Sequence, residues 1–206
     1  MSVTGDAARP GRLAHVHEHP EISDADLGLI RKLAPEARLV LDIGAGRGGF
    51  VSAARGRGLQ AWALDLEPDA AHLWQRDGVP GALGDGARAP FADGSFDVVR
   101  LKELIEHVED PLALIREAAR LLRPGGLLIV HTPSPYSQLY PVGNFWDDYT
   151  HVRPFSRLGL RRLIEDGGLR LERIEGYVAG RNALERALGR LLAPVLPHTY
   201  RVLARR

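Results

Sequence analysis

The sequence predicts an α/β fold in which a mostly parallel sheet is covered by helices on both faces. Short apolar segments alternate with amphipathic segments along most of the 206 residues, which is the pattern of repeated β-α-β units. Residues 127–130 are apolar at every position, as expected for a strand with both faces buried. With 45% hydrophobic and 26% charged residues, the chain can bury one substantial core but is short for two domains.

The first half of the chain carries start and stop signals for each expected element. Ser23 or Asp24 can cap a first helix, Gly58 can end a second, and Asp65 closes an apolar strand. In order, the expected elements are a helix over 24–33, a strand over 38–41, a helix over 50–57, a strand over 59–64, a helix over 68–76 and a weak strand over 79–83.

The second half continues the alternation around one long loop. Asp110 caps a helix that has Pro111 at its first position, and a Pro-Gly-Gly turn leads into the most apolar strand. In order, we expect a strand over 96–101, a helix over 111–122, a strand over 127–130, a loop over 132–155, a helix after Ser156, a strand over 169–178, a helix over 182–192 and a strand over 199–204. The helix over 182–192 has leucines on one face. It could lie on a membrane surface or pair with a second subunit in a homodimer, although packing against the sheet is favoured.

Charge and composition exclude several classes of function. The 27 basic and 26 acidic residues give a formal net charge of +1, so no overall field attracts nucleic acid or an anionic membrane. The chain has no cysteine, which excludes disulfides, a thiol nucleophile and cysteine-bound zinc. Residues 1–11 lack the apolar core of a secretory signal, and no run is long enough to cross a bilayer. We expect a cytoplasmic protein without stable membrane insertion and without a nucleic-acid partner.

The glycine-rich segment after the first strand indicates a nucleotide-cofactor loop. Gly44, Gly46 and Gly49 follow Asp42 closely, and glycines allow a backbone to turn tightly around a ligand. The same three glycines satisfy the spacing of the dinucleotide fingerprint, and a tight turn without a ligand would use them too. The loop alone therefore leaves the cofactor open.

Five motifs in a fixed order give the chain a resemblance to a known family. They are Leu41-Asp42-Ile43-Gly44-Ala45-Gly46, Asp65 after the second strand, Gly84-Asp85-Gly86, Phe96-Asp97-Val98-Val99 with Ile105-Glu106-His107-Val108, and Leu122-Arg123-Pro124-Gly125-Gly126. Over residues 38–171 the chain resembles class I S-adenosylmethionine-dependent methyltransferases, most of all the small-molecule subgroup that includes quinone-biosynthesis enzymes (methyltransferase type 11). The resemblance implies a Rossmann-like three-layer sandwich with a seven-stranded, mostly parallel sheet and an antiparallel last strand. It divides the chain into an N-terminal arm with its first helix (1–36) and a methyltransferase domain (37–206), with a substrate lid around 133–155.

The resemblance implies S-adenosyl-L-methionine as the cofactor and assigns residues to it. The assigned positions are Asp42, Gly44, Ala45 and Gly46 for the methionyl part, Asp65 for the ribose, Leu66, Asp85 and Gly86 for the adenine, and Lys102 and Glu103 beside the sulfonium. An acidic residue directly before the turn would repel a pyrophosphate but suits a cationic ligand, so Asp42 favours the methyl donor. An NAD(P)-dependent oxidoreductase and a non-catalytic cofactor-binding domain remain as alternatives. Asp65 and Asp85 could also be simple turn or capping residues.

The acceptor side offers His107 and His151 as candidate catalytic bases. His107 follows the fourth strand, where ligands bind in open α/β sheets, and His151 lies in the long loop. The resemblance implies a small-molecule acceptor, with methylation of oxygen slightly favoured. Either histidine could instead be structural. The loop aromatics Trp146, Tyr149 and Phe155 could likewise just close the core, with Asp147 or Asp148 paired to Arg153.

Two groups of side chains could bind a metal ion, but we assign none. His15, His17 and His19 alternate, so an extended segment would turn them to one side. Asp147, Asp148 and His151 could hold a divalent ion, as in some catechol-methylating relatives, but the full acidic set of that group is missing.

Overall fold

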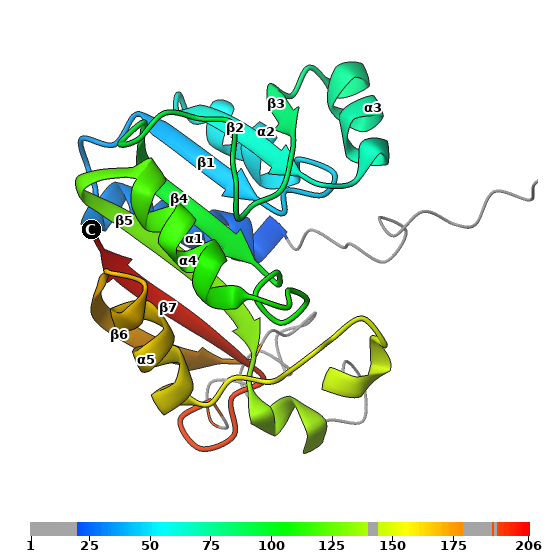
Figure 1. The fold of residues 1–206 in the computed structure, drawn as a ribbon, viewed down its shortest axis with the longest axis vertical. Coiled ribbons are helices and arrows are strands. Elements are labelled where there is room, and N and C mark those ends of the chain that lie inside the picture. Colours follow the sequence, from blue (N-terminus) through cyan, green and yellow to red (C-terminus); the bar gives the residue numbers. More distant parts are fainter. Residues whose placement is uncertain (1–19, 140–143, 179–190, 192) are drawn as a thin grey trace, which may run out of the picture.

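The computed structural model describes residues 20–139, 144–178, 191 and 193–206. Figure 1 shows a sheet with helices on both sides. The strands are β1 (Leu39–Ile43), β2 (Gln60–Asp65), β3 (Gly81–Leu83), β4 (Phe96–Lys102), β5 (Leu122–Pro133), β6 (Arg170–Tyr177) and β7 (Thr199–Arg205). The helices are α1 (Pro20–Leu33), α2 (Gly49–Arg55), α3 (Pro68–Asp77), α4 (Pro111–Leu121) and α5 (Arg157–Asp166), with short 3₁₀ helices η2 (Pro135–Leu139) and η3 (Phe145–Asp147).

The strands form one sheet of seven, in the order β3-β2-β1-β4-β5-β7-β6. The pairs from β3 to β5 are parallel. β7 lies antiparallel between β5 and β6. The predicted mostly parallel sheet with an antiparallel last strand is confirmed. Because parallel strands share their direction, the loops that leave β1 to β5 emerge at one edge of the sheet.

Alternating side chains divide the core into two layers. In β1, Leu41 and Ile43 pack with α4 and α5, whereas Val40 packs with α1 and α2. β5 repeats the division: Leu128 and Val130 face the first layer, and Leu127 and Ile129 face the second. In Figure 1, α4 and α5 cover the near face and α1 covers the far face. This is the three-layer sandwich that the sequence predicts.

The start of α1 differs from the prediction. In the described chain, this helix has Pro20 at its first position, so Ser23 and Asp24 lie inside it rather than at its N-cap. Ser23 is buried, and Asp24 pairs with Arg57 at the surface. A proline is favourable at a first helical position because that residue has no need of an amide hydrogen bond.

Two of the predicted features involve residues outside the described chain. The histidines at 15, 17 and 19 and almost all of the helix expected over 182–192 lie there. Within the described ranges, no helix combines the length and the apolar character needed to cross a bilayer.

Candidate active site

The glycine loop after β1 is held against the neighbouring strand. The amides of Gly44 and Ala45 both donate to the carbonyl of Leu64, at 2.8 and 3.2 Å. Gly44 and Gly46 have φ values of 74° and 50°, in the left-handed region that favours glycine. A Cβ on Gly44 would lie 3.1 Å from the side chain of Leu104. The loop therefore lies directly against the turn that follows β4.

The two predicted nucleoside-binding aspartates each hold a backbone turn. Asp65 accepts the amide of Gly46 at 2.8 Å and that of Glu67 at 3.0 Å, one on each carboxylate oxygen. Asp85 is exposed and accepts the amide of Ala87 at 2.8 Å. Each carboxylate oxygen has a further lone pair. Both residues thus have the turn role considered for them, and this role leaves acceptor capacity for a ligand.

The other predicted cofactor residues lie at the same edge of the sheet. Leu66 is 65% exposed after β2, and a Cβ on Gly86 would lie only 2.6 Å from Ile43. At the end of β4, Lys102 pairs with Glu103 at 2.9 Å. Glu103 has a φ of 48°, a conformation that costs free energy for a residue other than glycine. The structure brings all ten predicted cofactor residues to the loops and carboxyl ends of β1 to β4.

Asp42 belongs to a buried polar network that the sequence analysis missed. Its Oδ1 accepts from Arg100 Nη1 at 3.0 Å, and Arg100 Nε donates to Asp26 Oδ2 at 2.8 Å. His131 joins Asp26 through Nε2 at 3.0 Å and Tyr177 through Nδ1 at 2.9 Å. The side chains of Asp26, Asp42, Arg100 and His131 are at most 2% exposed. Arg100 and His131 are polar residues inside otherwise apolar strands, and this pattern is the sequence signal that could have indicated the network.

Burial and ion pairing act in opposite directions on this network. Burial opposes ionisation of Asp26, but the charges and hydrogen bonds of His131 and Arg100 hold its pKa below the usual value. Burial, together with the guanidinium groups of Arg100 and Arg201, lowers the pKa of His131 despite Asp26. The negative charge of Asp42, which favoured a cationic cofactor, is therefore partly neutralised by Arg100. The guanidinium of Arg100 is in turn shared between Asp42 and Asp26.

The acceptor side brings together two distant histidines. The rings of His107 and His151 have centroids 4.6 Å apart, and His151 stacks on Phe145 at 4.4 Å. His107 Nδ1 lies 2.9 Å from Thr150 Oγ1, and His151 Nδ1 lies 2.5 Å from the carbonyl of Phe145. Burial and the neighbouring His151 lower the pKa of His107. Both candidate bases therefore lie in one cluster.

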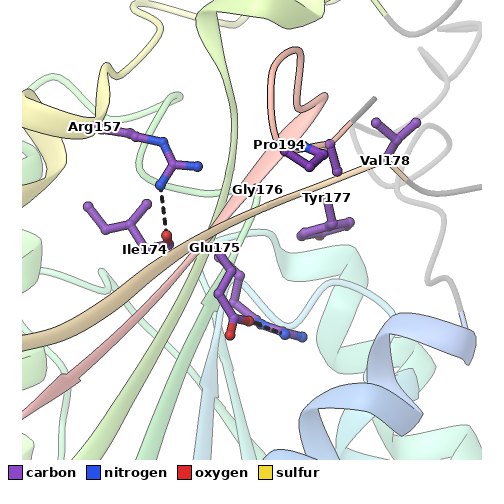
Figure 2. A pocket seen from close by; sticks show the side chains of 9 residues that line it. Arg157, Ile174, Glu175, Gly176, Tyr177, Val178 and Pro194 are labelled. Atoms are coloured by element: carbon purple, nitrogen blue, oxygen red, sulfur yellow. Dashed lines mark hydrogen bonds and ion pairs between the residues drawn. The ribbon is translucent and has the colours of Figure 1, made fainter. Parts of the chain in front are cut away.

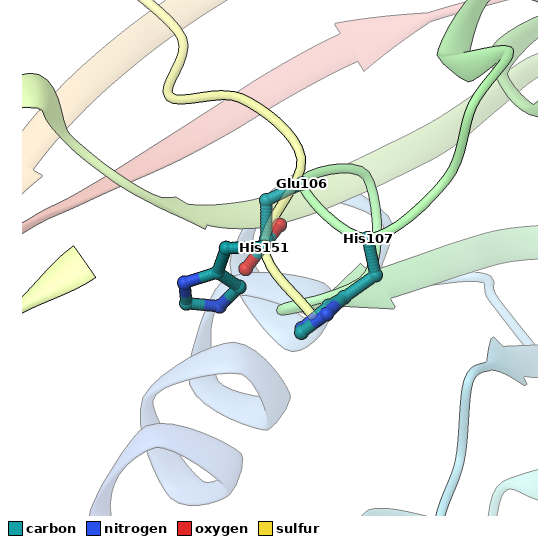
Figure 3. A group of neighbouring side chains, drawn as sticks. All are labelled: Glu106, His107 and His151. Carbon is teal, nitrogen blue, oxygen red and sulfur yellow. The ribbon is translucent and has the colours of Figure 1, made fainter. Parts of the chain in front are cut away.

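Glu106 completes this cluster from the same turn as His107 (Figure 3). It is fully buried, and its Oε2 accepts from Thr132 Oγ1 at 3.0 Å. Its Oε1 has no hydrogen-bond partner among the described residues. Burial, reinforced by the charge of Glu103, raises the pKa of Glu106 to about 8. One oxygen from Glu106 and one nitrogen from each histidine all lie within 4.8 Å of one another.

The predicted structural role for the loop aromatics holds for one residue of three. Phe155 is 8% exposed and packs in the core, as that interpretation requires. Trp146 and Tyr149 are 58% and 94% exposed, so neither closes the core. Large exposed aromatic side chains beside a buried polar cluster are available to contact a ligand.

The ion pair that belonged to this structural alternative, between Asp147 or Asp148 and Arg153, is not formed among the described residues. Asp147 accepts the amide of Asn144 at 2.9 Å, in the cap of η3. Asp148 accepts from Thr150 Oγ1 at 2.7 Å, and Arg153 donates to the carbonyl of Glu109 at 2.9 Å. Both aspartates thus have local roles. Among the described residues, His151 forms its potential metal-binding group with Glu106 and His107 rather than with these two aspartates.

A pocket of about 490 Å³ opens beside β6 and β7 (Figure 2). Its polar walls are paired: Arg157 donates to the carbonyl of Ile174 at 2.8 Å, and Arg201 binds Glu175. The lining reaches Val178, the last described residue before 179–190. We assign no ligand to this pocket.

The fold is shared with solved structures of S-adenosylmethionine-dependent methyltransferases. A structure of an S-adenosylmethionine-dependent methyltransferase from Mesorhizobium loti has a TM-score of 0.69 to this fold at 21% identity, covering 94% of this chain and all of that one. A structure described as the [4+2]-cyclase SpnF has a TM-score of 0.66 at 21% identity, covering 89% of this chain and 81% of that one. These likenesses establish the fold, and the cyclase illustrates that the fold alone does not fix the reaction.

The chain belongs to the methyltransferase domain family, whose sequence model matches residues 18–174. The ubiquinone biosynthesis O-methyltransferase of Xanthomonas campestris pv. campestris is 40% identical over 110 residues, which are 50% of this chain and 45% of that enzyme. The chain thus spans about half the length of the curated relatives it matches. The predicted class, a methyltransferase domain, is confirmed, and the fold is shared with a protein named as S-adenosylmethionine-dependent. The nicotinamide alternative is set aside.

Proposed function

We propose that the protein transfers the methyl group of S-adenosylmethionine to an oxygen atom of a small molecule by direct displacement. The acceptor oxygen loses its proton and forms a bond with the methyl carbon. The carbon–sulfur bond breaks with its electron pair going to sulfur, and S-adenosylhomocysteine leaves. Alignment of the three reacting atoms and exclusion of water would supply much of the rate acceleration.

The cofactor would lie across the carboxyl ends of β1 to β4. Gly44, Ala45 and Gly46 would let the methionyl part approach the backbone, and Asp42 would face its ammonium group. Asp65 would accept from the ribose hydroxyls through the lone pairs left by its two backbone hydrogen bonds. On the adenine we place Leu66, Asp85 and Gly86, and beside the sulfonium Lys102 and Glu103.

One observation carries the preference for oxygen: two imidazoles meet in one cluster next to the cofactor loop. His107 and His151 are 4.6 Å apart, centroid to centroid. Leu104, three residues before His107, packs on Gly44. A hydroxyl acceptor must lose a proton, whereas a carbon or unprotonated amine nucleophile would not need such groups. The relative named as an O-methyltransferase supports the same preference.

Cofactor binding is tested by calorimetry of the full chain with S-adenosylhomocysteine and, separately, with NAD. We expect the homocysteine nucleoside to bind and NAD not to bind. Asp65→Asn should weaken binding by about tenfold, as expected for loss of a charged hydrogen-bond acceptor, whereas Asp69→Asn, on the exposed face of α3, should change nothing. Binding of NAD without S-adenosylhomocysteine would overturn the cofactor assignment.

Turnover is tested with a panel of phenols, catechols and carboxylic acids, following S-adenosylhomocysteine and the methylated product by mass spectrometry. We expect methylation of a hydroxyl oxygen and a large loss of turnover in His107→Ala and His151→Ala with the cofactor affinity retained. If the cofactor binds but only nitrogen or carbon acceptors are methylated, the oxygen proposal is wrong. If no acceptor reacts, the non-catalytic alternative gains support. The absence of a nucleic-acid partner and the homodimer stay predictions.

A further inference from the structure

We propose that Glu106, His107 and His151 form a binding site for a divalent metal ion that holds the acceptor hydroxyl. The inference rests on the proposed function for the acceptor, but the ion site stands on its own geometry. It replaces our expectation that the protein has no metal site. Two imidazole nitrogens and one carboxylate oxygen can bind one face of an ion and leave the opposite positions open for a substrate.

The spacing of the three side chains fits a shared ion. Their ligand atoms all lie within 4.8 Å of one another. A divalent ion holds such atoms at about 2.0–2.3 Å from itself, so the cluster needs to contract by at most about 1–2 Å. Glu106 and His107 come from one turn, whereas His151 arrives from the loop after β5 (Figure 3). Binding would therefore fasten that loop to the turn.

The carboxylate of Glu106 is incompletely satisfied by the protein. The residue is fully buried, Oε2 accepts from Thr132, and Oε1 has no partner among the described residues. A buried polar atom without a partner costs free energy, and such atoms are rare in native proteins. A cation at this position would supply the missing interaction.

The hydrogen bonds of the histidines fix the tautomer that a metal ion requires. A carbonyl can only accept, so His151 Nδ1 must donate to the carbonyl of Phe145. Thr150 Oγ1 donates to Asp148, so it can accept from His107 Nδ1. Each ring then carries its lone pair on Nε2. Partners that hold the second nitrogen in this way are typical of metal-binding histidines.

The ion would take over the chemistry considered for a base. A hydroxyl bound at an open position has a lowered pKa and releases its proton to solvent, and the resulting oxyanion attacks the methyl carbon. The histidines then act as ligands rather than as proton acceptors. The imidazoles favour a borderline ion such as Co²⁺ or Zn²⁺ over Mg²⁺, which prefers oxygen ligands.

The test is a titration of tag-free, chelator-treated full chain with cobalt chloride, followed by calorimetry and visible absorption. All variants carry His15, His17 and His19 replaced by Ala, because those residues lie outside the described chain and could bind cobalt. We expect one ion per chain and weaker binding of Mg²⁺. Glu106→Gln and His151→Ala should each weaken cobalt binding by at least about tenfold, whereas His72→Ala, on the exposed face of α3, should not.

Thermal melting of each variant identifies any that fail to fold. Glu106 and His151 lie on separate segments, so if one of these two variants fails to fold, the other still tests the site. Absence of saturable cobalt binding up to about 1 mM, or binding that both variants retain, would overturn the proposal. Cobalt binding can be measured without cofactor or acceptor. A protein that binds S-adenosylhomocysteine but not cobalt refutes the ion site alone. One that binds cobalt but methylates nothing refutes the proposed function and the role of the ion toward the acceptor, but not the ion site.

Discussion

Replacing Asp26 with Asn should destabilise the fold far more than the same change at Asp24, two residues earlier on α1. Asp26 is fully buried and accepts from Arg100 Nε at 2.8 Å and from His131 Nε2 at 3.0 Å. Asp24 pairs with Arg57 at 2.6 Å, but these side chains are 61% and 39% exposed. The two aspartates therefore give a matched comparison of a buried ion pair with a surface ion pair on one helix.

The expected difference follows from what each substitution leaves behind. Removing one partner of a buried ion pair costs about 3–5 kcal/mol because the other charge stays buried without compensation. Asparagine keeps one acceptor oxygen, so we expect Asp26→Asn to cost about 3 kcal/mol, near the lower end. A surface pair contributes about 0–1 kcal/mol. In a domain of this size, 3 kcal/mol corresponds to a melting temperature lower by about 6–12 °C.

Urea unfolding of the wild type and both variants, monitored by circular dichroism, measures this difference. The dependence of unfolding free energy on urea should be equal in all three, which shows that the same surface unfolds. Equal losses for Asp24→Asn and Asp26→Asn would refute the reasoning, because the buried Arg100 would then be compensated without Asp26.

Three further expectations follow from the same structure. Asp26→Asn should shift Arg100 toward Asp42 and weaken binding of S-adenosylhomocysteine, whose ammonium group would face Asp42, whereas Asp24→Asn should not; equal binding by the two variants in calorimetry would contradict the shared charge. The pKa of His131 is lower in the folded chain than its ordinary value of 6.5. As the pH falls, His131 is therefore protonated in the unfolded chain before it is protonated in the folded chain. The stability that depends on neutral His131 is complete above pH 6.5 and declines below it. Urea unfolding on either side of that pH should show this decline, and His131→Asn should reduce it. Gly28 is exposed on α1 with free space at the Cβ position, so Gly28→Ala should stabilise the fold by about 0.5–1 kcal/mol. Gly86→Ala should destabilise it by about 1–3 kcal/mol, because the new Cβ would lie 2.6 Å from a core isoleucine. The opposite order of melting temperatures would be inconsistent with the packing.

The fold could be predicted from local patterns because the residues that start, form and end each helix or strand lie close together in the sequence. The uniformly apolar run at 127–130 became the middle of β5, and the glycines after Leu41 became the loop at the carboxyl edge. The first helix was misplaced at its start because Ser23 and Asp24 are good capping residues, whereas in the fold one is buried and the other forms a surface ion pair. Tertiary packing overrides a capping preference of about 1 kcal/mol.

The cofactor side of the site could be predicted because the carboxyl ends of parallel strands meet at one edge of the sheet, but the contacts on the acceptor side could be predicted only between neighbours in sequence. Glu106 and His107 are adjacent, but the ring of His151 approaches His107 although the two residues are 44 positions apart in the sequence, a separation that no spacing rule covers. The network of Asp26, Arg100 and His131 depends in the same way on how α1 crosses the sheet. Polar residues inside apolar strands signal that partners exist, but not which helix supplies them.

The position of β7 sets the order in which this sheet can be completed. In the described sheet, β7 is the one strand that pairs with β6, and β7 pairs with β5 on its other side. During synthesis, β6 leaves the ribosome first and must wait for the strand that will attach it. The charged residues on β6, among them Glu172, Arg173 and Glu175, oppose edge-to-edge association during that interval. The outer strand of the sheet is therefore added last even though it is made earlier.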